Sequence, residues 1–110
     1  MTAYAVAHLT SVEMGPAIRS YLEAIDATLA PFGGRFVIHG GPAEVLEGAW
    51  SGDLVVVAFP DRARAAAWYG SPAYQAILPL RRDHSRGAVV LMDGVDDSHR
   101  ATDVLAEGGG

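Results

Sequence analysis

The stretch Leu54–Phe59, with the sequence LVVVAF, decides the fold because it is the strongest strand signal in the chain. All its residues are apolar and three in a row are valine, which is typical of a central strand covered on both faces. Pro60-Asp61 follows it as a break and an N-cap. We therefore predict a central strand that leads into an alanine-rich helix over residues 62–69, which Gly70 ends.

Three further strands are predicted around this one. Ala3–Leu9 alternates in polarity and is the first strand, Arg35–His39 is the second, and the apolar run Ala88–Met92 is the last. Residues Glu44–Trp50 are expected to form a short edge strand. A second short helix begins at Ser71-Pro72 and runs to about residue 78.

An amphipathic helix is predicted between the first two strands. Thr10–Glu13 has capping-box spacing, and Pro16 suits a first helical turn. Apolar residues then recur at helical spacing, at Ile18, Tyr21, Leu22, Ile25 and Leu29. The order β-α-β-β-α-β predicts an α+β, ferredoxin-like fold: a four-stranded antiparallel sheet with its helices on one face.

The face of such a sheet that carries no helix is apolar here. Val6, Val37, Val56 and Val90 are predicted to lie on it. An exposed apolar surface of this size is typical of an interface, and the same face of a second copy is the simplest partner. We therefore predict a homodimer.

The composition limits both the organisation and the partners of the chain. Its 110 residues form one domain, over residues 1–94, followed by a polar, glycine-rich tail over 95–110 that we expect to be mobile. The net charge is −5 and the eight positive residues are spread along the chain, which argues against nucleic acid. The apolar runs are too short to span a membrane, and the first residues lack a signal-peptide pattern, so we predict a cytoplasmic protein.

Two missing residue types restrict the chemistry. The chain has no cysteine, which excludes disulfides, thiolate nucleophiles and cysteine-based metal sites. All eight basic residues are arginine, which excludes a lysine Schiff base. Four histidines, the carboxylates and the tyrosines remain as acid–base groups. No ligand-spacing pattern completes a metal site, so neither a metal nor a cofactor is expected.

The segment FPDRARAAAWYGSPAYQ at residues 59–75 resembles the signature of the domain-of-unknown-function family numbered thirteen-thirty. Residues 33–36 and 44–48 resemble its other recurrent block. The resemblance covers about residues 3 to 93 and implies a dimeric α/β barrel, in which two ferredoxin-like subunits pack sheet to sheet. Relatives in this superfamily include cofactor-free monooxygenases, haem-binding enzymes, isomerases, lyases and ligand binders, so the fold implies no particular activity.

His39 is the leading candidate for acid–base chemistry. It ends a strand next to a Gly-Gly turn, and histidine titrates near neutral pH. Arg35 is predicted on the same face, two residues earlier, where its guanidinium would hold a carboxylate or phosphate. His8 on the first strand is expected to join them. The alternatives are a half-exposed structural histidine and an ion pair of Arg35 with Glu44, Glu47 or a carboxylate of the partner chain.

Aromatic residues are the candidate walls of a substrate pocket. Trp68, Tyr69 and Tyr74 flank the break between the two short helices, and Tyr21 lies on the first helix. Arg81 belongs to a basic run, usually a solvated surface, but is placed to reach a pocket. The alternative for the aromatic residues, and the one favoured for Trp68, is ordinary core packing.

Three functions follow from these residues. The first is a cofactor-independent enzyme that acts by proton transfer on a small organic acid or an aromatic, polyketide-like metabolite, as an isomerase, lyase or cyclase. Its catalytic residues would be His39, Arg35 and His8. The second is a small-molecule-binding or accessory protein without catalysis. The third is a purely structural dimer.

Overall fold

A four-stranded antiparallel sheet forms the centre of the protein, which we describe from a computed structural model that defines residues 1–106. β1 spans Ala3–Val12, β2 Arg35–His39, β3 Asp53–Phe59 and β4 Ser85–Asp93. The strand order is β2-β3-β1-β4. β3, which contains the LVVVAF stretch, is a central strand as predicted.

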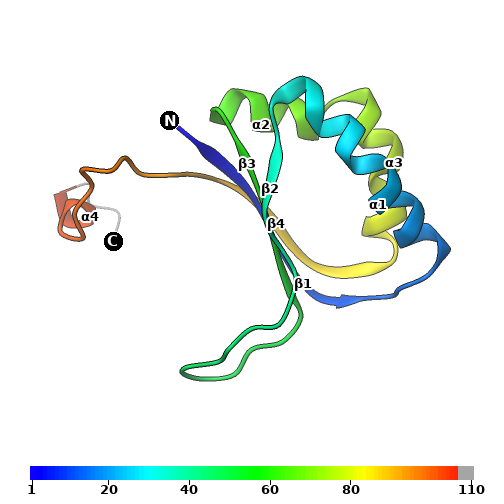
Figure 1. Ribbon diagram of the computed structural model, residues 1–110, viewed down its shortest axis with the longest axis horizontal. Coiled ribbons are helices and arrows are strands. Elements are labelled where there is room, and N and C mark those ends of the chain that lie inside the picture. Colours follow the sequence, from blue (N-terminus) through cyan, green and yellow to red (C-terminus); the bar gives the residue numbers. More distant parts are fainter. Residues whose placement is uncertain (107–110) are drawn as a thin grey trace.

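The helices α1 (Pro16–Leu29), α2 (Arg62–Tyr69) and α3 (Pro72–Arg82) all cover one face of the sheet (Figure 1). A short 3-10 helix, η1 (Ala30–Phe32), follows α1. The predicted β-α-β-β-α-β order and ferredoxin-like arrangement are therefore confirmed. A fourth helix, α4 (Asp103–Ala106), lies beyond the opposite face of the sheet (Figure 1).

The core lies between the sheet and these three helices. Of the apolar stripe predicted for α1, Ile18, Tyr21, Ile25 and Leu29 are buried, whereas Leu22 is 40% exposed. Phe59 and Tyr74 are completely enclosed. Two of the predicted N-caps are present: the Asp61 side chain accepts a hydrogen bond from Arg64 N at 2.8 Å, and Ser71 Oγ accepts one from Tyr74 N at 3.3 Å. Local sequence signals and core packing therefore agree at α2 and α3.

The predicted capping box before α1 is wrong. Thr10, Ser11 and Val12 belong to β1, and α1 begins at Pro16 after Gly15 without a side-chain cap. The reason is pairing: after an irregularity between Leu9 and Ser11, β1 continues its ladder with β4. Because a ladder satisfies several backbone groups at once, it prevails here over a single local cap.

Three other predicted boundaries also differ from the structure. Residues 44–50 form no strand. α3 continues past Pro79 to Arg82, and β4 begins at Ser85 rather than at residue 88. Of the predicted tail, residues 103–106 form α4, and residues 107–110 lie outside the described part of the chain.

A bulge in β2 changes which side chains share a face of the sheet. Arg35 pairs with Ala58 and Phe36 with Val57, but the register then shifts, so that Ile38 pairs with Val56 and His39 with Val55. Side chains opposite each other in an antiparallel pair lie on one face. Phe36 and His39 therefore both lie on the helix-covered face, and Arg35 and Ile38 lie on the other.

The face without helices, called the open face below, carries the predicted apolar row. Val6 pairs with Val56 on one side and with Val90 on the other. Val56 is shielded by its neighbours, whereas Val90 and Ile38 are 47% and 43% exposed. Val37 and Met92 are exposed as well. None of the helices in residues 1–106 is long and apolar enough to cross a membrane.

Candidate functional site

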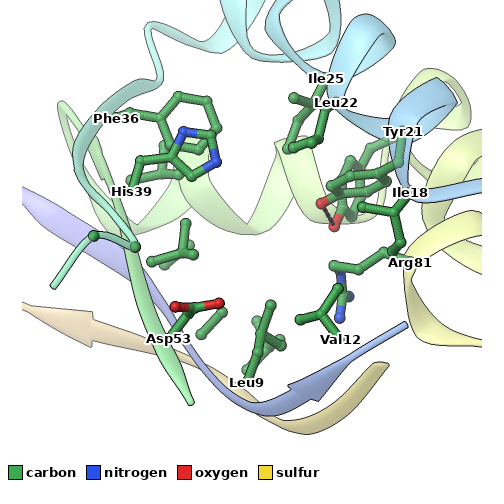
Figure 2. A pocket seen from close by; sticks show the side chains of 18 of the residues that line it. Leu9, Val12, Ile18, Tyr21, Leu22, Ile25, Phe36, His39, Asp53 and Arg81 are labelled. Carbon is green, nitrogen blue, oxygen red and sulfur yellow. Dashed lines mark hydrogen bonds between the residues drawn. The ribbon is translucent and has the colours of Figure 1, made fainter. Parts of the chain in front are cut away.

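A cavity of about 280 Å³ lies between the helix-covered face of the sheet and the helices α1 and α3 (Figure 2). Most of its walls are apolar, and they include Ala5, Ala7, Val55 and Val57 from the sheet and Ile18 and Ile25 from α1. The small alanine side chains of β1 leave this space unfilled. The volume is close to the lower end, about 300 Å³, of pockets that bind small molecules.

One end of the cavity, called the donor end below, is formed by Tyr21, Tyr74 and Arg81. The two tyrosine hydroxyls are 2.7 Å apart and hydrogen-bonded, and both rings are buried. The sequence places them there because Tyr21 lies in the buried stripe of α1 and Tyr74 in the first turn of α3. In Figure 2 the Tyr21 hydroxyl points into the cavity, and the dashed line marks its hydrogen bond to Tyr74.

Arg81 completes the donor end from the last turn of α3. Its guanidinium carbon is 5.8 Å from the centre of the Tyr21 ring, a cation–π arrangement. Burial lowers the pKa of Arg81, but the oxygens of Tyr74 and Tyr21 outweigh this and raise it above its usual value. In residues 1–106 no carboxylate forms an ion pair with Arg81. The donor end is therefore a positive, half-buried group without a counter-ion.

The buried tyrosine pair predicts how stability depends on pH. Burial first, and the Tyr74 hydroxyl second, raise the pKa of Tyr21 well above its usual range. The unfolded chain ionises this phenol near about pH 10, and the folded protein keeps it neutral. The contribution of Tyr21 to the free energy of unfolding is therefore complete below about pH 10. It falls as the pH rises further, by at most about 1.4 kcal/mol per pH unit.

We expect Tyr21→Phe to reduce this alkaline loss of stability, measured by urea unfolding at several values between about pH 8 and pH 11. The variant also loses about 1–3 kcal/mol at all pH values, because the Tyr74 hydroxyl loses its partner. Tyr69→Phe is the matched control, since Tyr69 does not line the cavity. An unchanged alkaline slope in Tyr21→Phe would contradict this account of the pair.

The other end of the cavity, called the histidine end, carries His39 and Asp53. The His39 ring stacks on Phe36 at a centroid distance of 4.3 Å, nearly parallel, because the bulge in β2 turns both side chains to this face. Gly40 and Gly41 follow, both with positive φ, and also line the cavity. His39 is exposed, so a bound molecule could contact its ring from the cavity side.

Asp53 is the residue of this end that sequence reasoning missed. It is the first residue of β3, and its neighbour Gly52 has a φ of 81° and lies directly against the backbone of Leu9. A side chain on Gly52 would collide there, so glycine allows β3 to begin next to β1. The signal was present: Asp53, Val55 and Val57 alternate along one strand and hence share one face.

Five of the eight predicted site residues line this cavity. They are His39, Tyr21, Trp68, Tyr74 and Arg81. Trp68 is also core, as the alternative interpretation held: it is 3% exposed, and its Nε1–H donates to Thr28 Oγ1 at 3.0 Å. Core packing and pocket wall are thus the same surface at this residue.

The structure separates the other three residues from the cavity. Arg35 lies on the open face and His39 on the other, because the bulge between them reverses the alternation; the prediction that the two share a face is wrong. His8 is also on the open face, where its ring stacks on Trp50 at 4.7 Å and Nε2 is 2.9 Å from the Ser51 carbonyl oxygen. Tyr69 packs beside Tyr74 and faces a smaller hollow next to β4.

The comparisons with known proteins define the family. Residues 2–95 match the model of the domain of unknown function DUF1330. The chain belongs to this family. No curated protein matches it. The DUF1330 signature around residues 59–75 forms the end of β3, α2 and the start of α3, which includes two walls of the cavity, Trp68 and Tyr74.

Several solved structures share the fold at low sequence identity. A protein of unknown function from Rhodopseudomonas palustris is 14% identical, with a TM-score of 0.63 over 86% of this chain and 83% of its own. A dimeric ferredoxin-like protein of unknown function from Jannaschia sp. CCS1 is 21% identical, with a TM-score of 0.55 over 86% and 100%. SnoaB, a cofactor-independent oxygenase from Streptomyces nogalater, is 14% identical, with a TM-score of 0.51 over 90% and 96%. At these sequence identities the similarity establishes the fold only, and the function has to be argued from the residues of the cavity.

Proposed function

We propose that this DUF1330 protein is a cofactor-independent enzyme that binds a small, largely apolar organic acid in the cavity and transfers a proton at a carbon of that molecule. One observation carries the proposal: an apolar cavity joins a half-buried arginine, which has no ion pair within residues 1–106, and two tyrosine hydroxyls at one end to a histidine at the other. The acidic group of the ligand would occupy the donor end, and its reactive carbon would lie at the histidine end.

The donor end supports recognition of an anion. Arg81 stays charged, and among the described residues it has no carboxylate partner. A charge in an apolar surrounding is stabilised when an opposite charge joins it, and guanidinium groups bind carboxylates in a planar fork. Since the Tyr21 and Tyr74 hydroxyls share one hydrogen bond, one hydroxyl hydrogen remains free to donate to the ligand.

The histidine end supports proton transfer. A neutral imidazole can take a proton from a carbon next to a carbonyl group and return it to the same or another carbon, which is the chemistry of an isomerase or lyase. Phe36 fixes the plane of the His39 ring by stacking. The negative charge of Asp53 at the same end would stabilise the imidazolium that forms. Arg81, and not Arg35, takes the anion-binding role.

The proposed ligand class is testable by thermal unfolding with pairs of matched compounds. We expect small aromatic and branched aliphatic carboxylates to raise the melting temperature, and their neutral amides to do so much less. At a ligand concentration of 100 times Kd, binding adds about 2.7 kcal/mol, which corresponds to a rise of roughly 10 °C in a domain of this size. Equal shifts with acids and amides would contradict recognition of an anion at Arg81.

A binding protein without catalysis is the second candidate function. The observation that favours it is the exposure of His39 and Asp53. Enzymes that abstract protons from carbon commonly exclude water from the reacting group, and this side of the cavity is accessible to solvent. Ligand binding without any proton exchange at the bound molecule would select this candidate.

The proposal includes a homodimer built on the open face. Its support is the apolar row of Val6, Ile38, Val90 and Met92, in which Val6 is half-buried and the other three are exposed, together with the solved ferredoxin-like protein that is described as dimeric. Burial of such a face in a two-fold pair removes apolar surface from water on both copies. The cytoplasmic location remains a prediction from the sequence.

A further inference from the structure

Two segments project from the body on the side of the open face (Figure 1). One is the long loop of residues 40–52, between β2 and β3, and the other is the arm of residues 94–106, which follows β4. They leave the sheet at opposite ends of its strands, so that the open face lies between them (Figure 1). The radius of gyration is 15.5 Å, whereas a compact chain of this length has about 13 Å.

The arm leaves the sheet in a fixed direction. Gly94 N donates to the Thr2 carbonyl oxygen at 2.7 Å, and Gly94 lies directly against the Tyr4 ring, where a larger residue would collide. Just before it, the Arg62 guanidinium binds both carboxylate oxygens of Asp93, at 3.0 and 3.2 Å. The chain is therefore held firmly up to the point where the arm begins.

Beyond Gly94 the arm has local structure but little to pack against. Asp96 Oδ1 accepts hydrogen bonds from Ser98 N and Oγ, and Asp103 Oδ2 accepts one from Arg100 N. The single helical turn α4 makes at most sparse contact with the rest of the described chain. One helical turn is not stable alone in water. Its Leu105 is 76% exposed, as expected of an element whose packing partner is another molecule.

The long loop is anchored to the open face. Trp50 stacks on His8, and Gly40 N donates to the Leu54 carbonyl oxygen at 2.9 Å. Its tip carries Leu46, which is 86% exposed. The loop and the arm thus both present apolar side chains on the side of the sheet where the exposed valines lie.

The charges of the open face and of the two projections are complementary. Arg35 lies on the open face and has no carboxylate within salt-bridge distance among residues 1–106. The projections carry exposed acidic residues, Glu44 and Glu47 on the loop and Asp97 on the arm. One chain therefore holds both the basic, apolar floor and the acidic, apolar projections. A two-fold pair requires this self-complementarity, because the same patch faces itself.

We infer that each arm reaches past the sheet-to-sheet contact and packs its α4 turn on the body of the partner copy. The inference rests on the homodimer proposed above and extends it: the arm, outside the sheet-to-sheet contact, becomes part of the interface. Arg35 then lies at the interface, where it meets a carboxylate of the partner.

The test is the dimer dissociation constant, measured by sedimentation equilibrium for the full chain. We expect Leu105→Asp to raise this constant at least about tenfold, since it puts a charge where apolar contact forms. Arg35→Glu should raise it by a similar factor. Arg19→Glu is the control, because Arg19 is exposed on α1, which covers the opposite face of the sheet. Circular dichroism checks that each variant is folded.

Hydrogen–deuterium exchange of residues 95–106 gives a second, direct readout. In the dimer these amides are expected to exchange several-fold more slowly than in protein diluted below the dissociation constant. A dimer in which Leu105→Asp changes neither affinity nor exchange overturns the role of the arm and leaves the sheet-to-sheet dimer intact. A wild-type chain that stays monomeric up to about 1 mM overturns the dimer itself, and the open face would then belong to a different partner.

Discussion

Replacement of Arg81 by methionine is expected to weaken carboxylate binding by roughly 30- to 5,000-fold, which is about 2–5 kcal/mol. Methionine keeps much of the apolar stem of arginine and removes the charge and its donors. The expected effect is large because Arg81 is half-buried and without a counter-ion in the described structure, so that the carboxylate of the proposed ligand would be its partner. Isothermal titration with the tightest-binding acid of the matched panel measures the change.

Arg82→Met provides a matched control on the same helix turn. Arg82 is exposed, lies 3.9 Å from the Asp83 carboxylate and does not line the cavity, so its loss should change Kd by less than about threefold. The neutral amide should bind Arg81→Met and wild-type protein alike. Equal weakening by the two arginine variants would mean that the charge acts at long range, and would remove Arg81 from the site.

The strand and helix order could be predicted from the sequence because each signal was strong and local. Each of these signals specifies one element from neighbouring residues alone. They are the LVVVAF run, the apolar stripe of α1 and the N-caps at Asp61 and Ser71. The capping box at residues 10–13 was equally well formed, yet that segment pairs with β4 instead. Pairing with a strand more than 70 residues away leaves no trace in a local pattern.

The site was predicted in part for a related reason. His39 and Arg35 share a face only if β2 is regular, and a single bulge between Phe36 and Ile38 separates them. A bulge inserts one residue and so inverts the alternation beyond it. Phe36-Val37-Ile38 is a normal strand sequence without glycine, so nothing in it indicated the irregularity. For this reason the proposed function gives the anion-binding role to Arg81 instead of Arg35.

Arg81 joins the tyrosines for a reason that only tertiary packing supplies. Its sequence context is a run of basic residues, typical of a solvated surface. Because α3 continues over Pro79 to Arg82, Arg81 falls in its last turn and reaches the Tyr21 ring of the neighbouring helix α1. With the predicted helix end at about residue 78, Arg81 lay in a loop, so its reach to a pocket could be predicted but its contact with Tyr21 could not.

Replacement of His39 by alanine is expected to reduce catalysed proton exchange by about 10²- to 10⁴-fold, the usual contribution of a general acid–base group. The exchange can be followed without knowledge of the natural product. An organic acid incubated with the protein in D₂O should lose the NMR signal of the C–H group from which His39 takes the proton. The imidazole exchanges that proton with solvent and returns a deuteron to the carbon. The negative charge that develops at the carbon is delocalised onto the ligand's own carbonyl group.

The binding constant separates this role from a structural one. His39 stacks on Phe36 at the more exposed end of the cavity, so His39→Ala should leave the Kd of the acid within about threefold of wild type while exchange is lost. His8→Phe is the matched control: His8 also stacks on an aromatic ring, but on the open face. Full exchange activity in His39→Ala would contradict the role of His39 as the acid–base group. Loss of exchange with an equal loss of affinity would instead show that His39 holds the ligand, and would leave the acid–base group unassigned.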